Sequence, residues 1–249
     1  MKQHLAKLKS YGIKNHSQEL TWMKNHAPNA SILDQWVQER CEGKPLAYIL
    51  KSMDFMDLSL YIDERVLVPR PETEVMVEHI ISNIQTTDQV IVDLGTGSGC
   101  IALSLKKTFP EKTVVGVDID QDALEVAIIN QKKYEQHRVQ WVVSDWLSTI
   151  DISTVDVIIA NPPYVETSWK DKSIQLEPHK ALYSDKDGLR DIRTIIQQVQ
   201  YSKGKVWIEH GHQHTLSKLF NKDWNVTQHY DLNKQPRFIN AMRTDHDKE

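Results

Sequence analysis

From residue 88 onward the sequence alternates between short apolar runs and segments with helical spacing. The apolar runs indicate buried strands, and strands separated by helices predict a parallel sheet covered on both faces. The last two extended segments follow each other directly and add an antiparallel pair. We therefore expect an α/β fold with a doubly wound, mostly parallel seven-stranded sheet. The predicted strands are 89–94, 113–118, 139–143, 155–160, 205–209, 224–232 and 237–243, and the predicted helices are 100–108, 121–136, 189–201 and 214–220.

The first 50 residues have a different pattern, with apolar residues three and four positions apart and no strand signal. This spacing predicts a small helical unit. Within it, Ser31 follows a turn at Pro28 and is the expected N-cap of a helix. A short segment, 55–62, is expected to form a hairpin or a linker strand.

A domain boundary is expected near Arg70, which stands between Pro69 and Pro71. Two prolines so close together exclude a helix interior, and a helix is expected to start after Pro71, with Glu72 and Glu74 favourable in its first turn. We therefore predict a helical N-terminal domain with its linker at 1–70 and an α/β domain at 71–249.

Composition narrows the class of protein. The chain has 249 residues and a net charge of −4, with basic residues spread along its length, which argues against a dedicated nucleic-acid binder. Its two cysteines, Cys41 and Cys100, are far apart, so a reduced cytoplasmic compartment is the simpler expectation. The N-terminal residues lack the apolar core of a signal peptide, and no apolar run approaches the length of a membrane span.

A glycine-rich turn follows the first strand of the α/β part. It consists of Gly95, Thr96, Gly97, Ser98 and Gly99. Glycines at this place let the backbone turn tightly and approach a ligand closely.

An acidic residue, Asp118, ends the next strand, where a carboxylate can accept hydrogen bonds from both ribose hydroxyls. Turn and carboxylate together fit a dinucleotide or S-adenosyl-L-methionine. The glycine spacing is tighter than the dinucleotide pattern G-x-G-x-x-G.

The string Asp93-Leu94-Gly95-x-Gly97-x-Gly99 resembles the first motif of class I methyltransferases, which have a Rossmann-like fold. The resemblance implies that S-adenosyl-L-methionine is the cofactor and that Asp118 binds its ribose. It also implies that Asp145 and Trp146, after the third strand, flank the adenine.

A second motif, Asn161-Pro162-Pro163-Tyr164, ends the fourth strand. The prolines prevent further strand pairing and make a rigid corner at the edge of the sheet where ligands bind. An amide NH₂ group is a poor nucleophile, and two acceptors that grip its hydrogens would orient its lone pair towards a methyl donor. Asn161 Oδ1 and the Pro162 carbonyl are suitable acceptors, and Tyr164 can pack on the flat acceptor. Asn161 is thus expected to border both cofactor and acceptor, and the motif resembles that of methyltransferases acting on adenine, guanine or glutamine amides.

Further motifs resemble the peptide chain release factor N5-glutamine methyltransferases. The family methylates N5 of the glutamine in the Gly-Gly-Gln motif of class I release factors and leaves S-adenosyl-L-homocysteine. The resemblance implies the same activity here, with the helical domain contacting the release factor and Arg70 in the substrate cleft, although Arg70 could instead form a structural ion pair. The matching segments are 43–49, Pro69-Arg70-Pro71-Glu72-Thr73-Glu74, 93–105, 161–164, Glu177-Pro178, Asp187-Gly188-Leu189 and Glu209-x-Gly211-x-Gln213.

Some positions depart from the family pattern. Lys51 stands where a glycine often occurs, Asp185-Lys186 replaces a small glycine pair, and Asn233-Lys234 interrupts an Asp-x-x-Gly turn. These departures bear on partner docking and loop geometry rather than on chemistry.

Two other functions remain open from the residues alone: a nucleic-acid amino methyltransferase acting on adenine N6 or guanine N2, and a silent relative that only binds a partner. The histidines at 210, 212 and 214 lack the accompanying ligands of a zinc site, so no metal is expected. The connection 165–187 is either a lid over the substrate or a surface loop. We expect no membrane association and no direct nucleic-acid binding.

Overall fold

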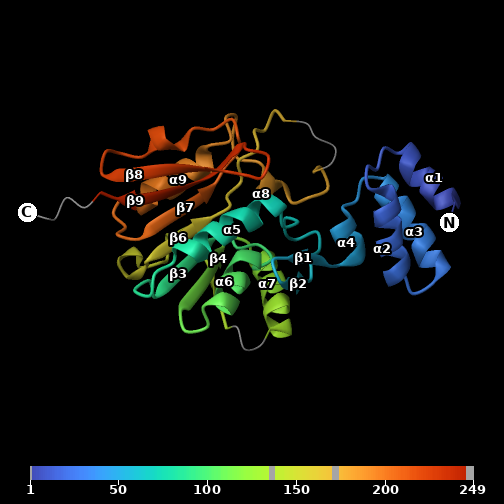
Figure 1. Cartoon of the computed structure of the whole chain (residues 1–249), viewed down its shortest axis with the longest axis horizontal. Coiled ribbons are helices and arrows are strands. Elements are labelled where there is room, and N and C mark those ends of the chain that lie inside the picture. Colours follow the sequence, from blue (N-terminus) through green and yellow to red (C-terminus); the bar gives the residue numbers. More distant parts are fainter. Residues whose placement is uncertain (1, 135–137, 170–173, 245–249) are drawn as a thin grey trace, which may run out of the picture.

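The structure is a computed structural model and describes residues 2–134, 138–169 and 174–244. The N-terminal helices are α1 (Lys2–Ser10), α2 (His16–His26), α3 (Ala30–Cys41) and α4 (Leu46–Leu50). The first three form a lobe at one end of the molecule, and α4 lies between that lobe and the sheet (Figure 1). The lobe has a small core of its own, which includes Leu8, Met23 and Val37.

The predicted cap of α3 is wrong by two residues. Asn29 is the N-cap, because its extended backbone lets its side-chain oxygen accept a hydrogen bond from the Ile32 amide at 3.0 Å. Ser31 lies inside the first turn of the helix. Asparagine and serine are both good caps, but Asn29 is the residue with the extended backbone that an N-cap needs.

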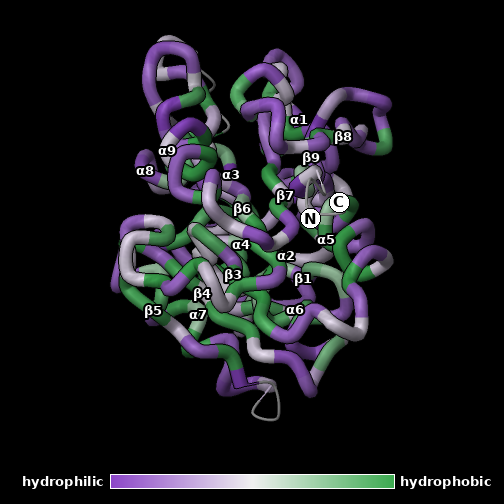
Figure 2. The backbone as a smooth tube through the Cα atoms, turned by 90° about the vertical axis from the view of Figure 1, so that its left-hand side faces the viewer, coloured by the Kyte–Doolittle hydropathy of each residue, from purple (hydrophilic) through white to green (hydrophobic). Residues whose placement is uncertain are grey.

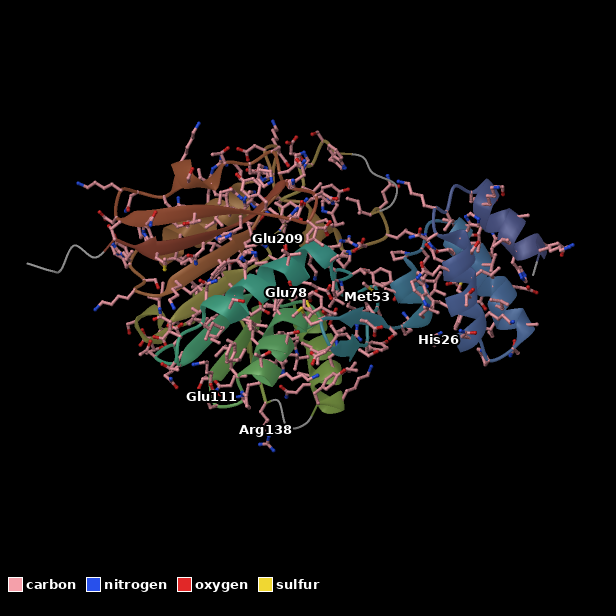
Figure 3. The ribbon with its side chains drawn as sticks, viewed as in Figure 1. His26, Met53, Glu78, Glu111, Arg138 and Glu209 are labelled. Atoms are coloured by element: carbon pink, nitrogen blue, oxygen red, sulfur yellow. The ribbon has the colours of Figure 1, made fainter. Side chains whose placement is uncertain are left out.

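A hairpin of β1 (Met53–Phe55) and β2 (Leu58–Leu60) joins the helical lobe to the rest of the chain. Figure 3 marks Met53 at this junction. The hairpin side chains Phe55, Leu58 and Leu60 are buried in the larger core beneath the sheet. Helix α5 (Pro71–Asn83) then starts at Pro71 itself, one residue before the predicted start, and Glu72 and Glu74 lie in its first turn as predicted.

The sheet has seven strands in the order β5-β4-β3-β6-β7-β9-β8, which confirms the predicted fold class. Strands β3 to β7 are parallel, whereas β9 is antiparallel to both of its neighbours. The middle strands are among the most hydrophobic stretches of the chain (Figure 2). The strands are β3 (Val90–Leu94), β4 (Thr113–Asp118), β5 (Gln140–Val143), β6 (Val157–Ala160), β7 (Lys205–Glu209), β8 (Trp224–Tyr230) and β9 (Pro236–Arg243).

Helices cover both faces of the sheet. On one face α5, α6 (Cys100–Thr108) and α7 (Gln121–Lys133) pack in the larger core, and on the other face α9 (Arg190–Val199) packs in a second core. The predicted end of α7 at Gln136 lies outside the described residues. A short helix, α8 (His179–Leu182), follows the connection after β6, in which 170–173 also lie outside the described residues.

The helix predicted at 214–220 is wrong. Only a 3₁₀ turn, Leu216–Leu219, forms there, and no side chain caps it. His214 bonds instead to the Asp187 carbonyl at 3.0 Å and stays outside the turn. The remaining residues are too few to stabilise an α-helix. A second 3₁₀ turn, Ile152–Thr154, precedes β6.

Within the described residues, no helix is both long and apolar enough to cross a membrane.

Candidate active site

A cavity of about 290 Å³ opens at the carboxyl ends of β3, β4, β5 and β6. The neighbouring strands β3 and β6 mark the point where the strand order reverses, which is where open α/β sheets bind ligands. The cavity therefore lies where the sequence places the cofactor. Its lining includes seven of the predicted site residues: Gly95, Gly97, Asp118, Asp145, Trp146, Asn161 and Pro163.

The glycine turn presents alternate residues to the cavity. Gly95 and Gly97 line it, whereas Thr96 and Ser98 are buried behind the turn with Gly99. Thr96 anchors the turn, because its amide donates to the Val117 carbonyl at 2.8 Å and its hydroxyl donates to Asp93 at 2.6 Å. These two hydrogen bonds fix the buried side of the turn. On the cavity side, the backbone of Gly95 and Gly97 can come close to a ligand.

Asp93 is fully buried under this turn. Burial raises the pKa of its carboxyl to about 7, against which the Thr96 hydrogen bond acts. Its second oxygen, Oδ1, has no hydrogen-bond partner among the described residues.

Asp118 lines the cavity directly beside the turn. One carboxylate oxygen accepts from the Gly97 amide and the other from the Asp120 amide, both at 2.9 Å. Each oxygen keeps a further lone pair, so the pair can still accept from two hydroxyls. Burial raises the pKa of Asp118, and this effect exceeds that of the two amides.

Trp146 has a left-handed backbone with φ of +50°, an uncommon conformation for a bulky residue. Its ring packs on Gly95, where a Cβ atom would lie 3.3 Å from the ring. The adjacent Asp145 is exposed at the cavity rim. A flat ring against a side-chain-free backbone leaves a narrow apolar wall, which suits a planar base.

Asn161 is held by residues that are distant in sequence. Its Nδ2 donates to the Thr73 hydroxyl at 3.1 Å, and that hydroxyl donates to Glu209 Oε2 at 2.7 Å. Tyr164 donates to the other oxygen of Glu209 at 3.1 Å. Pro162 is buried between the two polar ends of the motif. One carboxylate, at the end of β7 and beside α5, therefore holds the whole corner (Figure 3).

Glu209 is completely buried. Burial raises the pKa of its carboxyl to about 7, while the Thr73 and Tyr164 hydrogen bonds and the charge of Arg237 act in the other direction. Burial and the nearby Glu209 charge raise the pKa of the Tyr164 hydroxyl, so Tyr164 remains a neutral donor.

Gly188 explains a further motif residue. It has φ of +68°, and a Cβ atom would lie 2.3 Å from the Tyr164 carbonyl oxygen. The turn at 187–189 therefore buttresses the acceptor corner, and only glycine fits there.

Arg70 does not line the cofactor cavity. Its Nη2 donates to Oε1 of Glu177 at 2.6 Å, and it borders a second depression between the helical lobe and the α/β domain. Glu177 also accepts from the Val68 amide at 3.1 Å. The two family motifs at 69–74 and 177–178 thus meet at this ion pair.

Sequence reasoning missed several residues that shape the site. Thr73 and Glu209 both lie in motifs that match the family, but no local pattern shows that their side chains meet. Lys180 and Asp120 form an ion pair at the cavity mouth, between α8 and the start of α7. Asn130 is fully buried and donates to the Ser98 and Tyr61 carbonyls at 2.9 and 3.0 Å, which ties the glycine turn to the segment after the hairpin.

No cluster of three or more His, Cys, Asp or Glu side chains in the described ranges is placed to hold a metal ion.

Comparison with known proteins finds a matching family model and several similar proteins. The family model described as Methyltransferase small domain matches residues 71–178. A release factor glutamine methyltransferase of Buchnera aphidicola subsp. Schizaphis graminum is 40% identical over 200 residues, covering 78% of this chain and 72% of the relative. That of Streptococcus pneumoniae is 39% identical over 196 residues, covering 74% and 69%. The chain belongs to the release factor glutamine methyltransferase family. The resemblance found in the sequence is thereby confirmed.

Solved structures share the fold of this release factor glutamine methyltransferase family member at low identity. The hMettl16 catalytic domain in complex with the MAT2A 3′UTR hairpin 1 has a TM-score of 0.61 at 16% identity and covers 92% of each chain. The T. thermophilus 16S rRNA N2 G1207 methyltransferase in complex with AdoMet and guanosine has a TM-score of 0.54 at 13% identity, covering 78% of this chain and 50% of that one. At such identities the likeness shows the fold alone, which is that of a class I methyltransferase.

Proposed function

We propose that the protein transfers a methyl group from S-adenosyl-L-methionine to N5 of the glutamine in the Gly-Gly-Gln motif of a class I peptide chain release factor. The observation that carries the proposal is the orientation of Asn161. Its Nδ2 is engaged by Thr73, so its Oδ1 is left to accept from a substrate amide at the edge of the cofactor cavity. Membership of the family supplies the substrate.

The residues around the cavity fit this cofactor. Asp118 has lone pairs free for two ribose hydroxyls, the backbone of Gly95 and Gly97 is open to close approach, and Trp146 provides an apolar wall for the adenine. Asp145 lines the cavity next to Trp146. Thr96, Ser98 and Gly99 would act by shaping the turn. When bound, S-adenosyl-L-methionine supplies an activated methyl carbon, so the protein needs to position an acceptor rather than activate a donor.

The acceptor corner performs that positioning. Asn161 Oδ1 and the Pro162 carbonyl accept the two hydrogens of the glutamine NH₂ group, which turns its lone pair towards the methyl donor. Pro163 fixes the corner at the cavity wall, and Tyr164 covers the flat face of the amide. The developing positive charge on nitrogen is stabilised by the same two oxygens. The amide proton becomes acidic as the bond forms and needs no strong base beforehand.

We propose that residues 1–70 recognise the release factor and that 71–249 carry out methyl transfer. The depression that Arg70 borders runs between the helical lobe and the α/β domain and provides room for a protein loop. A net charge of −4 argues against nucleic acid as the partner. Free, buried Cys41 and Cys100 fit a reduced cytoplasmic compartment.

The test is a methyl-transfer assay with radiolabelled S-adenosyl-L-methionine that offers a class I release factor, its Gly-Gly-Gln→Gly-Gly-Ala variant, or total RNA and DNA. We expect label on the release factor alone and none on its alanine variant. Asn161→Ala should abolish labelling. Label on nucleic acid alone would overturn the proposal.

A further inference from the structure

A hydroxyl with a single proton links Asn161 to Glu209. Thr73 Oγ1 lies 2.7 Å from Glu209 Oε2 and 3.1 Å from Asn161 Nδ2. An ionised carboxylate can only accept, so the Thr73 proton points to Glu209. The Thr73 oxygen must then accept from Asn161, which requires the NH₂ end of the amide to face it.

The orientation of the amide decides what the site offers to a substrate. With Nδ2 turned to Thr73, Oδ1 is free of donors among the described residues and can grip the acceptor NH₂ group. If the side-chain amide were rotated by half a turn, Asn161 would present its own NH₂ group to the NH₂ group of the substrate. Two donors would then face each other without an acceptor. An amide side chain has nearly the same shape in both orientations, so packing alone does not choose between them.

We propose that Glu209 and Thr73 are positioning residues for methyl transfer: the ionised carboxylate fixes the Thr73 hydroxyl, which in turn fixes Asn161 with its oxygen towards the acceptor. The proposal rests on the function inferred above. It makes catalysis depend on a carboxylate at the end of β7 that touches neither cofactor nor substrate. Through Tyr164 the same carboxylate also sets the far end of the acceptor corner.

The surroundings of Glu209 make its charge sensitive to pH. Burial opposes ionisation, as does the like charge of Glu72 on the first turn of α5, and together they outweigh Arg237 on β9 and the donors Thr73 and Tyr164. Two further titratable groups lie close by: burial raises the pKa of the Cys100 thiol at the start of α6 to about 12 and lowers the pKa of the adjacent His210, so both stay neutral. When Glu209 is protonated, its hydroxyl can donate a hydrogen bond to the Thr73 oxygen. The Thr73 hydroxyl then no longer donates to Glu209 and can donate to the Asn161 oxygen instead. The amide then turns, and the grip on the acceptor is lost.

The first experiment measures methylation of a release factor across the neutral pH range. Thr73→Val keeps the shape but removes the hydroxyl, and we expect roughly a 10- to 100-fold loss in kcat with unchanged cofactor affinity by calorimetry. Thr73→Ser should restore most of that loss. Glu209→Gln should remove the fall in kcat on the acidic side of the wild-type profile. The matched control is Thr194→Val, which removes an exposed hydroxyl on α9 and should leave the profile unchanged.

A second measurement works without any substrate. In ¹⁵N-labelled protein, the side-chain amide signals of Asn161, assigned by their loss in Asn161→Ala, should shift with pH in wild type but not in Glu209→Gln or Thr73→Val. A folded Thr73→Val protein with wild-type kcat, or Asn161 signals that titrate equally in Glu209→Gln, would overturn the inference. If wild type leaves release factors unmethylated, the proposed function fails, while the amide signals still decide the role of Glu209.

Discussion

Arg70 donates a hydrogen bond of 2.6 Å to Glu177, whose side chain is only 2% exposed. The pair joins the start of α5 to the segment before α8, and through the Val68 amide it also fixes the backbone that enters the motif at 69–74. Arg70 itself remains partly exposed at the rim of the depression beside the helical lobe. Arg70 therefore stabilises the fold through Glu177 and also presents part of its side chain to the depression.

Substitution can separate these two roles. Arg70→Met leaves the Glu177 carboxylate buried without its cation, so we expect a loss of about 1–3 kcal/mol in the free energy of unfolding, measured with urea. Arg70→Met combined with Glu177→Gln should recover part of it. If Arg70→Met unfolds like wild type and only raises KM for the release factor, then Arg70 acts on the substrate rather than on the fold.

The Lys180–Asp120 ion pair spans the mouth of the cofactor cavity. Lys180 is 59% exposed, so the pair contributes at most about 1 kcal/mol, which corresponds to about a fivefold change in an equilibrium constant. Lys180→Ala should therefore release cofactor up to about fivefold faster in stopped-flow fluorescence. Exposed Lys203→Ala is the control, and equal release rates in all three proteins would show that α8 does not retain the cofactor.

Asp93 makes stability depend on pH. Burial raises its pKa from 3.8 to about 7, so between these values the folded protein holds a proton that the unfolded chain has lost. Its contribution to stability is thus complete at acidic pH and is lost as the pH rises to about 7. We expect the stability of wild type relative to Asp93→Asn to fall between about pH 4 and pH 7 in urea unfolding. Other titrating groups are common to both proteins, and a flat difference would show that Asp93 is ionised in the fold.

Lys51 and Lys234 both occupy left-handed backbone, with φ of +53° and +60°. They stand where the family often has glycine, so these two departures from the family pattern coincide with backbone strain. The Lys234 turn is fixed by Asp231, whose Oδ1 accepts from the Asn233 and Gln235 amides at 2.9 Å.

Lys234→Gly should therefore raise the free energy of unfolding by about 0.5–1 kcal/mol, since glycine relieves the steric cost but gains freedom in the unfolded chain. Lys51→Gly should gain less, because it also loses the ion pair with Glu64. Lys222→Gly, an exposed position without positive φ, should gain nothing. A loss of stability in Lys234→Gly would contradict this reading.

The order of the parallel strands and their helices follows from the sequence, because each parallel strand is a short, mostly apolar run that ends in or is followed by a polar or glycine residue. The same local signal places Gly95, Asp118 and Asn161 at one edge, since the carboxyl ends of parallel strands meet there. The local pattern does not determine the helix boundaries near 30 and 214. Asn29 and Ser31 are both good caps at the first, and Asp187, which is distant in sequence, holds His214 at the second.

The support of the site could not be predicted in this way. Thr73, Glu209 and Tyr164 come from α5, β7 and the loop after β6, and no spacing in the sequence shows that their polar atoms meet. The ion pairs of Arg70 and Lys180 depend equally on how distant segments fold over the cavity. The local sequence pattern thus predicts at which edge of the sheet a residue lies. The atoms that its side chain contacts depend on the tertiary fold.

The Thr73–Glu209 hydrogen bond joins residues that are 136 positions apart in the chain. A chain emerging from the ribosome presents the glycine turn, Asp118 and Asn161 well before β7 has been made. The acceptor corner therefore acquires its geometry only when late, long-range contacts form, and such contacts are the slow ones in folding. Every residue that lines the cofactor cavity precedes β7 in the chain, so the carboxylate bonded to Thr73 is the last part of the site to be synthesised.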